Sequence, residues 1–191
     1  MCGRYILIAK KKIKKVFNIE IVPNYNIAPS MPVLILDEKL EAHFMKWGIN
    51  KEVKGKKINI FNSRSESIKN NNIYYKINTC IFLSNGYYEW KNIDNIKIPY
   101  FLYFKKKMML FAGIYNNSGC SIVTKESDKK ISHIHKRQPI ILDEKEIALW
   151  LEKRHNFSST ISKNINYHPV STSVNNIKNN LENNIENTNE K

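Results

Sequence analysis

A cysteine directly follows the initiator methionine, and this position gives one residue two nucleophiles. Cys2 is small enough to permit removal of Met1 by the cell's aminopeptidase, after which it carries a free α-amine beside its thiol. The amine titrates near ~8 and the thiol near ~8.5, so both are partly nucleophilic at neutral pH. Such a 1,2-aminothiol condenses with an aldehyde: the amine forms an imine, which the thiol closes to a thiazolidine. It can also attack an amide carbonyl as an N-terminal nucleophile, and an ordinary second residue is the third interpretation.

Glu89 is a second residue whose setting suggests chemistry. It stands in the aromatic run Tyr87-Tyr88-Glu89-Trp90, directly after the turn signal Asn85-Gly86. Burial between aromatic rings would desolvate the carboxyl and raise its pKa toward general acid/base work. The alternation of the strand itself favours the other interpretation, an outward-facing glutamate flanked by inward-facing rings.

The segment Asn62-Ser63-Arg64-Ser65-Glu66 marks a junction between a strand and a helix. Ser63 and Glu66 have the spacing of a capping box, which predicts a structural role for Glu66. Backbone N–H groups at such a junction favour an anion, so Asn62 and Arg64 are candidates for phosphate contact. A surface arginine with no ligand is the alternative for Arg64.

The histidines and cysteines do not form a metal-binding pattern. His133 and His135 are expected on one face of a strand, but no carboxylate or cysteine ligand lies near them in the sequence. Cys2, Cys80 and Cys120 are widely spaced and odd in number, without the spacing of a zinc site or a disulfide framework. We therefore expect no metal, no cofactor and a reduced protein, with Cys80 a small core residue.

The charge balance points to a polyanionic partner. The chain of 191 residues has 31 basic and 17 acidic side chains, a formal charge of +14 and a pI of about 9.6. This excess favours nucleic acid over a membrane surface, although abundant Lys, Ile and Asn throughout indicate that part of it is compositional. A hydrophobic content of 42% predicts a folded core. No signal region or bilayer-length apolar run is present, so we expect a cytoplasmic protein.

Hydrophobic patterning predicts mainly strands with two clear helices. Ile13, Val16 and Phe17 form an apolar stripe on a helix at 10–17, and Asp143 with Glu146 caps a helix at the C-terminal side. The Lys-rich stretch 49–58 is expected to be a mobile loop. The strands are expected at 5–8, 33–36, 41–47, 79–83, 99–104, 109–115, 121–124 and 140–142. We expect one domain at 1–174 and a polar, flexible tail at 175–191.

Eight ordered motifs resemble those of the SRAP family, the SOS-response-associated or abasic-site-processing proteins. The resemblance covers Cys2 to about Asn179, and eight motifs in the family's order are hard to obtain by accident. The motifs are Met1-Cys2-Gly3-Arg4-Tyr5, Tyr25-Asn26-Ile27-Ala28-Pro29, Lys46-Trp47-Gly48-Ile49, Asn62-Ser63-Arg64-Ser65-Glu66, Asn85-Gly86-Tyr87-Tyr88-Glu89-Trp90, Ala112-Gly113-Ile114-Tyr115, Ile134-His135-Lys136-Arg137-Gln138-Pro139 and His168-Pro169-Val170-Ser171.

The resemblance implies an α+β fold with a barrel-like, mainly antiparallel β core, flanking helices and a basic groove for single-stranded DNA. It implies a monomer that crosslinks to abasic sites through Cys2 as a thiazolidine. Asn62 then resembles the residue that orients the amine, Glu89 the acid/base for ring opening and imine formation, and His135 the one for closure and reversal. Arg64 and Arg137 resemble phosphate-gripping arginines, and the implied neighbours of the DNA channel are Arg4, Pro29, Trp47, Trp90 and Thr124.

Two departures from the family pattern bear on these expectations. Lys136 and Gln138 stand where the family commonly has an acidic residue and a methionine, and Lys136 adds positive charge beside His135. The stretch after Gly48 lacks the usual Pro- and Trp-containing loop, so a grip on DNA by charge is expected there. An N-terminal cysteine amidohydrolase or autopeptidase remains the alternative function, and a noncatalytic basic nucleic-acid-binding module is the third.

Overall fold

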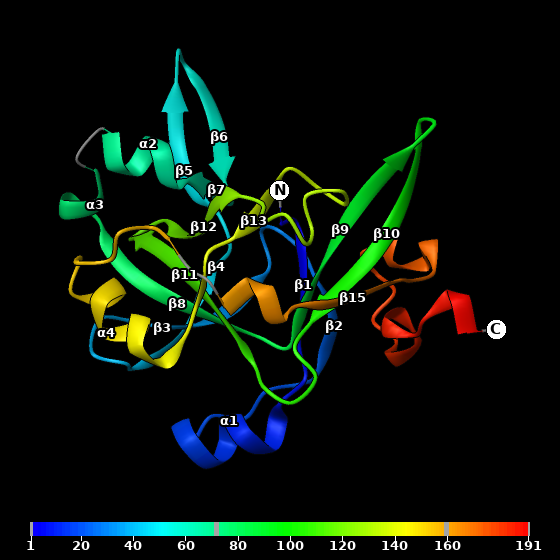
Figure 1. The fold of residues 1–191 in the computed structure, drawn as a ribbon. Coiled ribbons are helices and arrows are strands. Elements are labelled where there is room, and N and C mark those ends of the chain that lie inside the picture. The colour runs from blue at the N-terminus through cyan, green and yellow to red at the C-terminus, as the bar shows by residue number, and fades with distance from the viewer. Residues whose placement is uncertain (1, 71–72, 159–160, 191) are drawn as a thin grey trace.

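The computed structural model describes residues 2–70, 73–158 and 161–190. Two main sheets and a separate hairpin make up the fold (Figure 1). One sheet has five strands in the order β15-β10-β9-β1-β2, and the other has the path β13-β12-β11-β8-β3-β4, with β7 and β14 paired beside it. The strands are β1 Arg4–Leu7, β2 Asn24–Ile27, β3 Pro32–Leu36, β4 Ala42–Lys46, β5 Ile49–Val53, β6 Lys56–Ile60, β7 Asn62–Arg64, β8 Asn78–Ser84, β9 Gly86–Ile93, β10 Ile96–Tyr103, β11 Met109–Asn116, β12 Gly119–Glu126, β13 Arg137–Pro139, β14 Ile141–Leu142 and β15 Asn166–Pro169.

Within the described residues, every strand pair is antiparallel except β7 with β12. This arrangement confirms the α+β class with a mainly antiparallel core. The helices are α1 Lys10–Phe17, α2 Ser65–Asn70, α3 Ile73–Lys76 and α4 Glu144–Leu151, and the 3₁₀ helices are η1 Ile161–Asn164, η2 Thr172–Asn175, η3 Glu182–Ile185 and η4 Thr188–Glu190.

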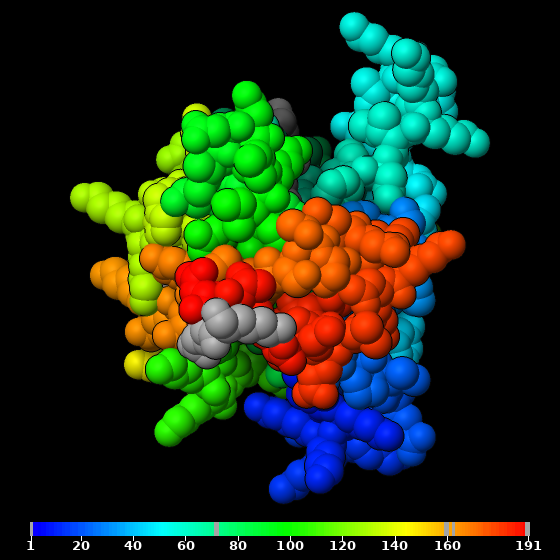
Figure 2. Space-filling model, turned by 90° about the vertical axis from the view of Figure 1, so that its right-hand side faces the viewer, coloured from blue at the N-terminus to red at the C-terminus, as the bar shows by residue number. Residues whose placement is uncertain are grey.

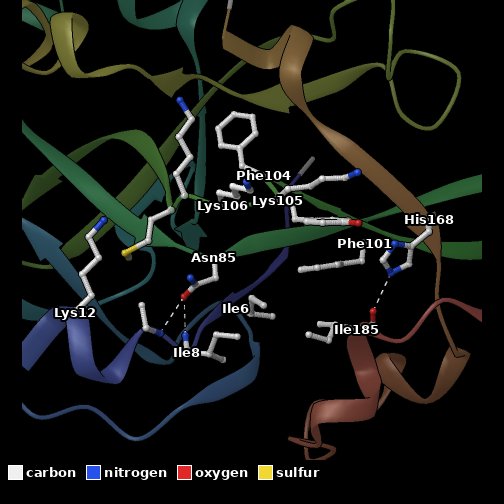
Figure 3. Close-up of a pocket in the computed structure, with 14 residues that line it drawn as sticks. Ile6, Ile8, Lys12, Asn85, Phe101, Phe104, Lys105, Lys106, His168 and Ile185 are labelled. Atoms are coloured by element: carbon white, nitrogen blue, oxygen red, sulfur yellow. Dashed lines mark hydrogen bonds between the residues drawn. The ribbon is translucent and has the colours of Figure 1, made fainter.

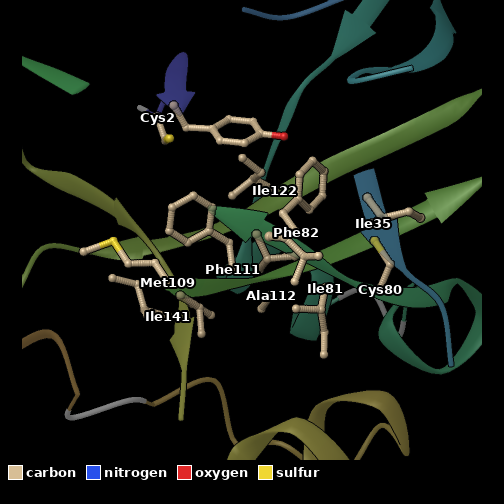
Figure 4. Packing of buried hydrophobic residues seen from close by; sticks show 14 of the residues in the cluster. Cys2, Ile35, Cys80, Ile81, Phe82, Met109, Phe111, Ala112, Ile122 and Ile141 are labelled. Atoms are coloured by element: carbon tan, nitrogen blue, oxygen red, sulfur yellow. The ribbon is translucent and has the colours of Figure 1, made fainter. Parts of the chain in front are cut away.

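The core is the apolar layer between the two sheets. Figure 4 shows Phe82 of β8 and Phe111 of β11 within this layer, beside Ile122 of β12. Tyr5 of β1 reaches across from the other sheet, with its ring centroid 6.5 Å from Phe82 and 6.2 Å from Phe111. Edge-on aromatic contacts of this kind add to the stability from burying apolar area. They hold β1, and therefore Cys2 just before it, against the second sheet.

Both predicted helices are confirmed, although Val16 of the expected apolar stripe on the first of them is exposed. Helix α1 spans 10–17 and buries Ile13 while its lysines remain exposed. Helix α4 begins after Asp143, whose side chain accepts from the N–H groups of Lys145 and Glu146. The Glu146 side chain accepts in return from the N–H of Asp143, completing the capping box.

Two local expectations were wrong. The Lys-rich stretch 49–58 is not a mobile loop but part of the β5–β6 hairpin, in which Ile49 pairs with Ile60. Ser63 does not cap a helix, because it lies inside β7 and its hydroxyl pairs with that of Ser121 at 2.9 Å. A lysine-rich strand pair shows no apolar alternation on its exposed faces, so the hydrophobic pattern did not indicate it.

The C-terminal segment, expected to be a flexible tail, carries 3₁₀ turns and packs on β2. Asn26 of β2 donates through Nδ2 to the carbonyl oxygens of Asn176 and Asn179 at 3.0 and 2.9 Å. Asn184 is buried and donates to the same carbonyl of Asn179. Figure 2 shows this segment spread over one face of the molecule, with the β5–β6 hairpin projecting beyond it. Hydrogen bonds from asparagine side-chain amides therefore hold this polar segment against β2.

Among the described helices, none is long and apolar enough to cross a membrane.

Candidate functional site

Cys2 lies two residues before β1 and is fully buried. Its thiol Sγ is 3.8 Å from the carbonyl oxygen of Arg4. Burial raises the pKa of the Cys2 thiol well above its ordinary value, and the nearby Glu89 carboxylate raises that pKa further. The thiol is therefore protonated at neutral pH in this setting, so it needs a base when it reacts.

Asn62, the first residue of β7, holds the cysteine in place. Its Nδ2 donates to the carbonyl oxygen of Cys2 at 2.7 Å. Its Oδ1 is buried and has no hydrogen-bond partner among the described residues. A buried amide oxygen without a donor is costly, so this atom is available to accept from an amine or hydroxyl at the site. The parallel pairing of Asn62 with Ile122 of β12 fixes the position of β7.

Glu89 of β9 is 3% exposed, so the structure supports burial over the outward-facing alternative. Its strand neighbour Tyr88 pairs with Arg4, which places β9 directly beside the start of β1. Burial raises the pKa of the Glu89 carboxyl above its ordinary value, and His135 opposes that rise. A raised pKa brings a carboxyl closer to the operating pH, which suits general acid/base work.

His135 follows the turn after β12 and faces Glu89, with Nδ1 3.8 Å from the Glu89 Oε1. It lies between that turn and β13 and not on the expected strand, so it does not share a strand face with His133, which is in the turn. Its Nδ1 lies 3.0 Å from both the backbone nitrogen and the carbonyl oxygen of Arg137. A neutral Nδ1 accepts from that N–H, and a protonated Nδ1 donates to that oxygen. The ring can therefore keep its position while it gains or loses a proton.

A depression of about 570 Å³ opens beside Glu89 and His135. Trp90 forms one wall and is fixed there by its Nε1, which donates to the Asn175 Oδ1 at 2.8 Å. The other lining residues are Asn92, Lys97 and Asn175. The depression thus joins an aromatic ring, a cation and two titratable side chains, which is a suitable lining for a strand of nucleic acid.

Arg137 lies at this edge of the site and is held by several acceptors. Its two terminal nitrogens contact the Glu66 carboxylate at 2.7 and 3.0 Å, and one of them donates to the Thr124 carbonyl at 2.7 Å. Its hydrogen bonds hold the pKa of Glu66 below its ordinary value. Glu66 therefore positions Arg137 instead of capping a helix. Arg64 lies on β7, which pairs with β12 as β13 does, and its side chain is exposed.

Removing the Glu66 charge is expected to lower stability in a pH-dependent way. A folded-state pKa below the unfolded value contributes stability that is present above the unfolded pKa and is lost as the pH falls through the folded value. Because Glu66 is half-exposed, the pair with Arg137 is expected to contribute at most about 1 kcal/mol. Urea unfolding of Glu66→Gln, Arg137→Gln and the double variant should give this coupling at pH 7 and little at pH 3. Equal coupling at both pH values would contradict the assignment.

Two of the expected DNA-channel neighbours are in the core. Trp47 is fully buried, and its Nε1 donates to the carbonyl oxygen of Phe61 at 2.8 Å. Its ring packs edge-on against Tyr5 at 5.2 Å between centroids. Thr124 is also fully buried within β12. Neither side chain is exposed to contact a strand: Trp47 belongs to the apolar core, and the Thr124 hydroxyl lies between the Ser63 carbonyl and the Arg137 guanidinium.

Arg4 and Pro29 lie near the surface but have structural surroundings. The Arg4 guanidinium donates to the Asn26 Oδ1 and to the Val174 carbonyl, each at 2.8 Å. It therefore ties the C-terminal segment to β1 and β2. Pro29 is half-buried in the turn between β2 and β3.

Sequence reasoning missed three lining residues and the role of Glu66. Asn92, Lys97 and Asn175 reach the depression through the β9–β10 hairpin and the C-terminal segment. Asn175 was placed in the tail because its surroundings are polar and aperiodic. The hydrogen bond from Trp90 to Asn175 joins residues 85 positions apart, and the local pattern gives no signal for it.

An exposed group of possible metal ligands lies in the β3–β4 turn. Asp37, Glu41 and His43 bring one ligand-type atom each to within 4.8 Å of one another. The Asp37 carboxylate already accepts from the N–H groups of Lys39 and Glu41 and contacts His43 Nε2 at 2.9 Å. These hydrogen bonds account for the position of the cluster.

Comparison with known proteins identifies the class. Residues 1–177 match the family described as SOS response associated peptidase (SRAP). The chain therefore belongs to the SRAP family, as the ordered motifs had indicated.

Its relatives include proteins from bacteria and animals. The chain is 30% identical to the abasic site processing protein YoqW of Bacillus subtilis, over 81% of this chain and 82% of that protein. It is 25% identical to the abasic site processing protein YedK of Escherichia coli, over 93% and 96%. A solved protein of Bacteroides thetaiotaomicron shares the fold, with a TM-score of 0.76 at 17% identity over 97% of this chain and 99% of that chain.

Proposed function

We propose that this protein processes abasic sites in single-stranded DNA by linking covalently to them through Cys2 once Met1 has been removed. The names of its relatives support the substrate, and the site supports the chemistry. The observation that carries the proposal is the meeting of Cys2 with Asn62 and the buried Glu89 in one place. An aminothiol, an unsatisfied amide oxygen and a carboxyl of raised pKa are the groups that condensation with an aldehyde requires.

The reaction starts with the sugar. An abasic deoxyribose is mostly a closed hemiacetal, so a proton donor at the ring oxygen and a base at the hydroxyl are needed to expose the aldehyde. Glu89 serves as this acid/base, because burial raises the pKa of its carboxyl and so favours the protonated form more than water does. Asn62 accepts from the Cys2 amine through Oδ1, which orients the nitrogen lone pair toward the carbonyl carbon.

Ring closure then consumes the imine. The amine adds to the aldehyde and loses one water to give the imine. The thiol sulfur then bonds to the imine carbon, its proton leaves to a base, and the nitrogen takes up a proton. Because burial keeps the thiol protonated, closure depends on a neighbouring base, and Glu89 is placed for it. An imine left open would invite β-elimination and strand cleavage, so the thiol protects the strand and any lyase activity comes from the open imine.

His135 supports the reverse direction. Reopening the thiazolidine requires a proton on the departing sulfur, and water must then hydrolyse the imine. The His135 ring has a main-chain partner in either protonation state and lies beside Glu89. It can therefore pass a proton to the site without a change of position.

DNA binding is assigned to the depression and its basic edge. Trp90 offers a ring for stacking, and Lys97 and Arg64 offer charge for phosphates. Binding of a single strand is expected to weaken with salt, because each phosphate contact adds roughly 0.7 to the salt slope.

The test uses the Met1-processed protein and a single-stranded oligonucleotide that carries one abasic site. A heat-stable band on a denaturing gel is expected, and mass spectrometry of its digest should place the adduct on Cys2 with the loss of one water. Cys2→Ala removes the band. Cys2→Ser keeps the amine but not the thiol, so it should give a labile adduct together with strand cleavage. An intact oligonucleotide gives no band.

An N-terminal amidohydrolase would behave differently in the same experiment. If the wild-type protein binds the abasic strand but gives no adduct, the thiazolidine proposal fails. Release of a peptide or amine product that depends on Cys2 would then favour the amidohydrolase. A noncatalytic binding module would bind intact and abasic strands equally and would not respond to Cys2→Ala.

A further inference from the structure

A second pocket of about 510 Å³ lies at the opposite end of β1 from Cys2. Ile6, near the far end of this strand, and Ile8, just beyond it, line the pocket (Figure 3). Ile8 is six residue steps along the chain from Cys2, which corresponds to roughly 20 Å at about 3.3 Å per step in an extended chain. None of the residues that line this pocket belongs to the Cys2 site, so the two sites are distinct.

Two hydrogen-bonded contacts hold the walls of this pocket in place. The Asn85 Oδ1 accepts from the N–H groups of Ile8 and Ala9 at 2.8 and 3.1 Å, which fixes the start of α1 against the β8–β9 corner (Figure 3). On the other side, His168 of β15 donates from Nε2 to the carbonyl oxygen of Ile185 at 2.8 Å. The pocket is therefore held by side chain–backbone bonds from separate parts of the chain.

The inner part of the pocket is aromatic. Tyr103 of β10 lies parallel to Phe101, with ring centroids 5.1 Å apart and planes 9° apart. His168 stands edge-on to Tyr103 at 5.4 Å. Phe104 follows at the start of the β10–β11 turn, where the Lys107 ammonium lies 5.2 Å from its ring centroid. A planar ring that enters here can extend an existing stack.

The rim of the pocket is basic and lacks compensating charge. Lys105, Lys106 and Lys107 are consecutive in the β10–β11 turn, and Lys12 of α1 also lines the pocket. None of the lining residues is acidic. Within the described part of the chain, none of these four lysines forms an ion pair with a carboxylate. Four uncompensated cations around one opening attract an anion with several charges.

The two halves of the lining together select the ligand. An apolar molecule would gain nothing from the lysines, and a bare anion would gain nothing from the stacked rings. A nucleoside phosphate combines a planar base with a charged group at the distance of one sugar. We propose that this pocket is a second, noncovalent site that binds a nucleoside phosphate, either as a free nucleotide or as one unit of a single strand. The proposal does not depend on crosslinking at Cys2.

The first test measures binding of dAMP and of inorganic phosphate to the full chain by titration calorimetry. Stacking of the base is expected to make dAMP bind about tenfold more tightly than phosphate. Tyr103→Leu, with all lysines kept, should remove this preference. Lys105→Gln/Lys106→Gln/Lys107→Gln should weaken dAMP binding about tenfold. A charge-matched control is Lys39→Gln/Lys76→Gln/Lys145→Gln, whose exposed lysines lie outside the pocket and which should bind dAMP as the wild type does.

A second arm distinguishes the two sources of the ligand. It uses an intact labelled strand of twelve thymidines, which contains no aldehyde and cannot crosslink, and measures affinity against salt. If the natural ligand is a strand, the variant with Lys105, Lys106 and Lys107 replaced by glutamine should bind it with a smaller salt dependence. The magnitude of the salt slope should fall by about 2, because each of three lost phosphate contacts removes roughly 0.7. If the natural ligand is a free nucleotide, the same variant should bind dAMP more weakly, while the salt slope of strand binding should stay at the wild-type value. The proposal is overturned if dAMP binds no more tightly than phosphate and the two triple variants weaken strand binding equally. Thermal unfolding of each variant shows that it is folded.

Discussion

Replacing Glu89 by glutamine is expected to slow adduct formation with an abasic strand by roughly 10²- to 10⁴-fold, the usual contribution of a positioned acid/base. Glutamine keeps the size and polarity of the side chain but can neither give nor take a proton. The sugar ring then opens only at its uncatalysed rate, and the thiol, whose pKa burial raises, loses its nearby base. DNA binding itself should change little, because the loss falls on the rate of the chemical step.

The measurement is a single-turnover time course of the heat-stable adduct at saturating protein. Glu126→Gln is the matched control, since Glu126 is an exposed glutamate on β12, and it should react at the wild-type rate. Supplying the aldehyde as an open-chain model compound should restore much of the Glu89→Gln rate, because ring opening is bypassed. A Glu89→Gln rate within about threefold of wild type would rule out the acid/base role.

The same substitution is expected to raise stability while it lowers activity. Burial places the folded-state pKa of Glu89 above its unfolded value. The protonated carboxyl therefore contributes stability that is fully present when the pH is below the unfolded pKa of about 4.3. That contribution is lost as the pH rises through the folded-state pKa. Glu89→Gln should therefore match wild type in thermal unfolding at pH 4 and exceed it at pH 8. Such a gain is typical of a residue retained for function at a cost in stability.

The sequence predicted the elements whose signals are local. The apolar stripe around Ile13 gave α1, and Asp143 with Glu146 gave the start of α4, because helix caps and stripes are contained within a few residues. The Asn85-Gly86 signal was equally local, although it marks a corner where the chain passes from β8 to β9 of the other sheet and not a hairpin turn. Resemblance to a family then named Cys2, Asn62, Glu89 and His135, which the structure brings to one end of β1.

What the sequence did not reveal depends on contacts between distant segments. Strand alternation favoured an outward-facing Glu89, but the successive residues Tyr88 and Glu89 are both buried, so both faces of β9 are covered here. Glu66 sits 71 positions from Arg137, and a capping box was the nearest local explanation for it. The C-terminal asparagines are polar and aperiodic, yet their amides meet Asn26 on β2. Hydropathy does not record such hydrogen bonds.

Among the residues whose surroundings the sequence did not reveal, Trp47 is expected to contribute most to stability. Trp47→Ala should cost about 3–5 kcal/mol of unfolding free energy, because it empties a large site in a core that cannot fully collapse. The ring is fully buried, meets Tyr5 edge-on, and donates to the Phe61 carbonyl, which would lose this donor and keep the N–H of Ile122. A loss of this size corresponds to a melting temperature roughly 10 °C lower. Trp47→Phe keeps part of the ring volume and should cost clearly less.

Trp90 is the matched comparison for Trp47, because it is also a tryptophan at a motif position. Unlike Trp47, it is only half-buried and lines the depression beside Glu89. Trp90→Ala should lower the melting temperature much less than Trp47→Ala and should weaken binding of an intact single strand about tenfold, as loss of one stacked base would. Urea unfolding and fluorescence anisotropy on the two variants separate the roles. If Trp47→Ala instead left stability unchanged and weakened strand binding, Trp47 would belong to the DNA channel, as the family resemblance had implied. Its burial between the two sheets argues against that outcome, because a side chain without exposed surface can act on a strand only through the fold that it supports.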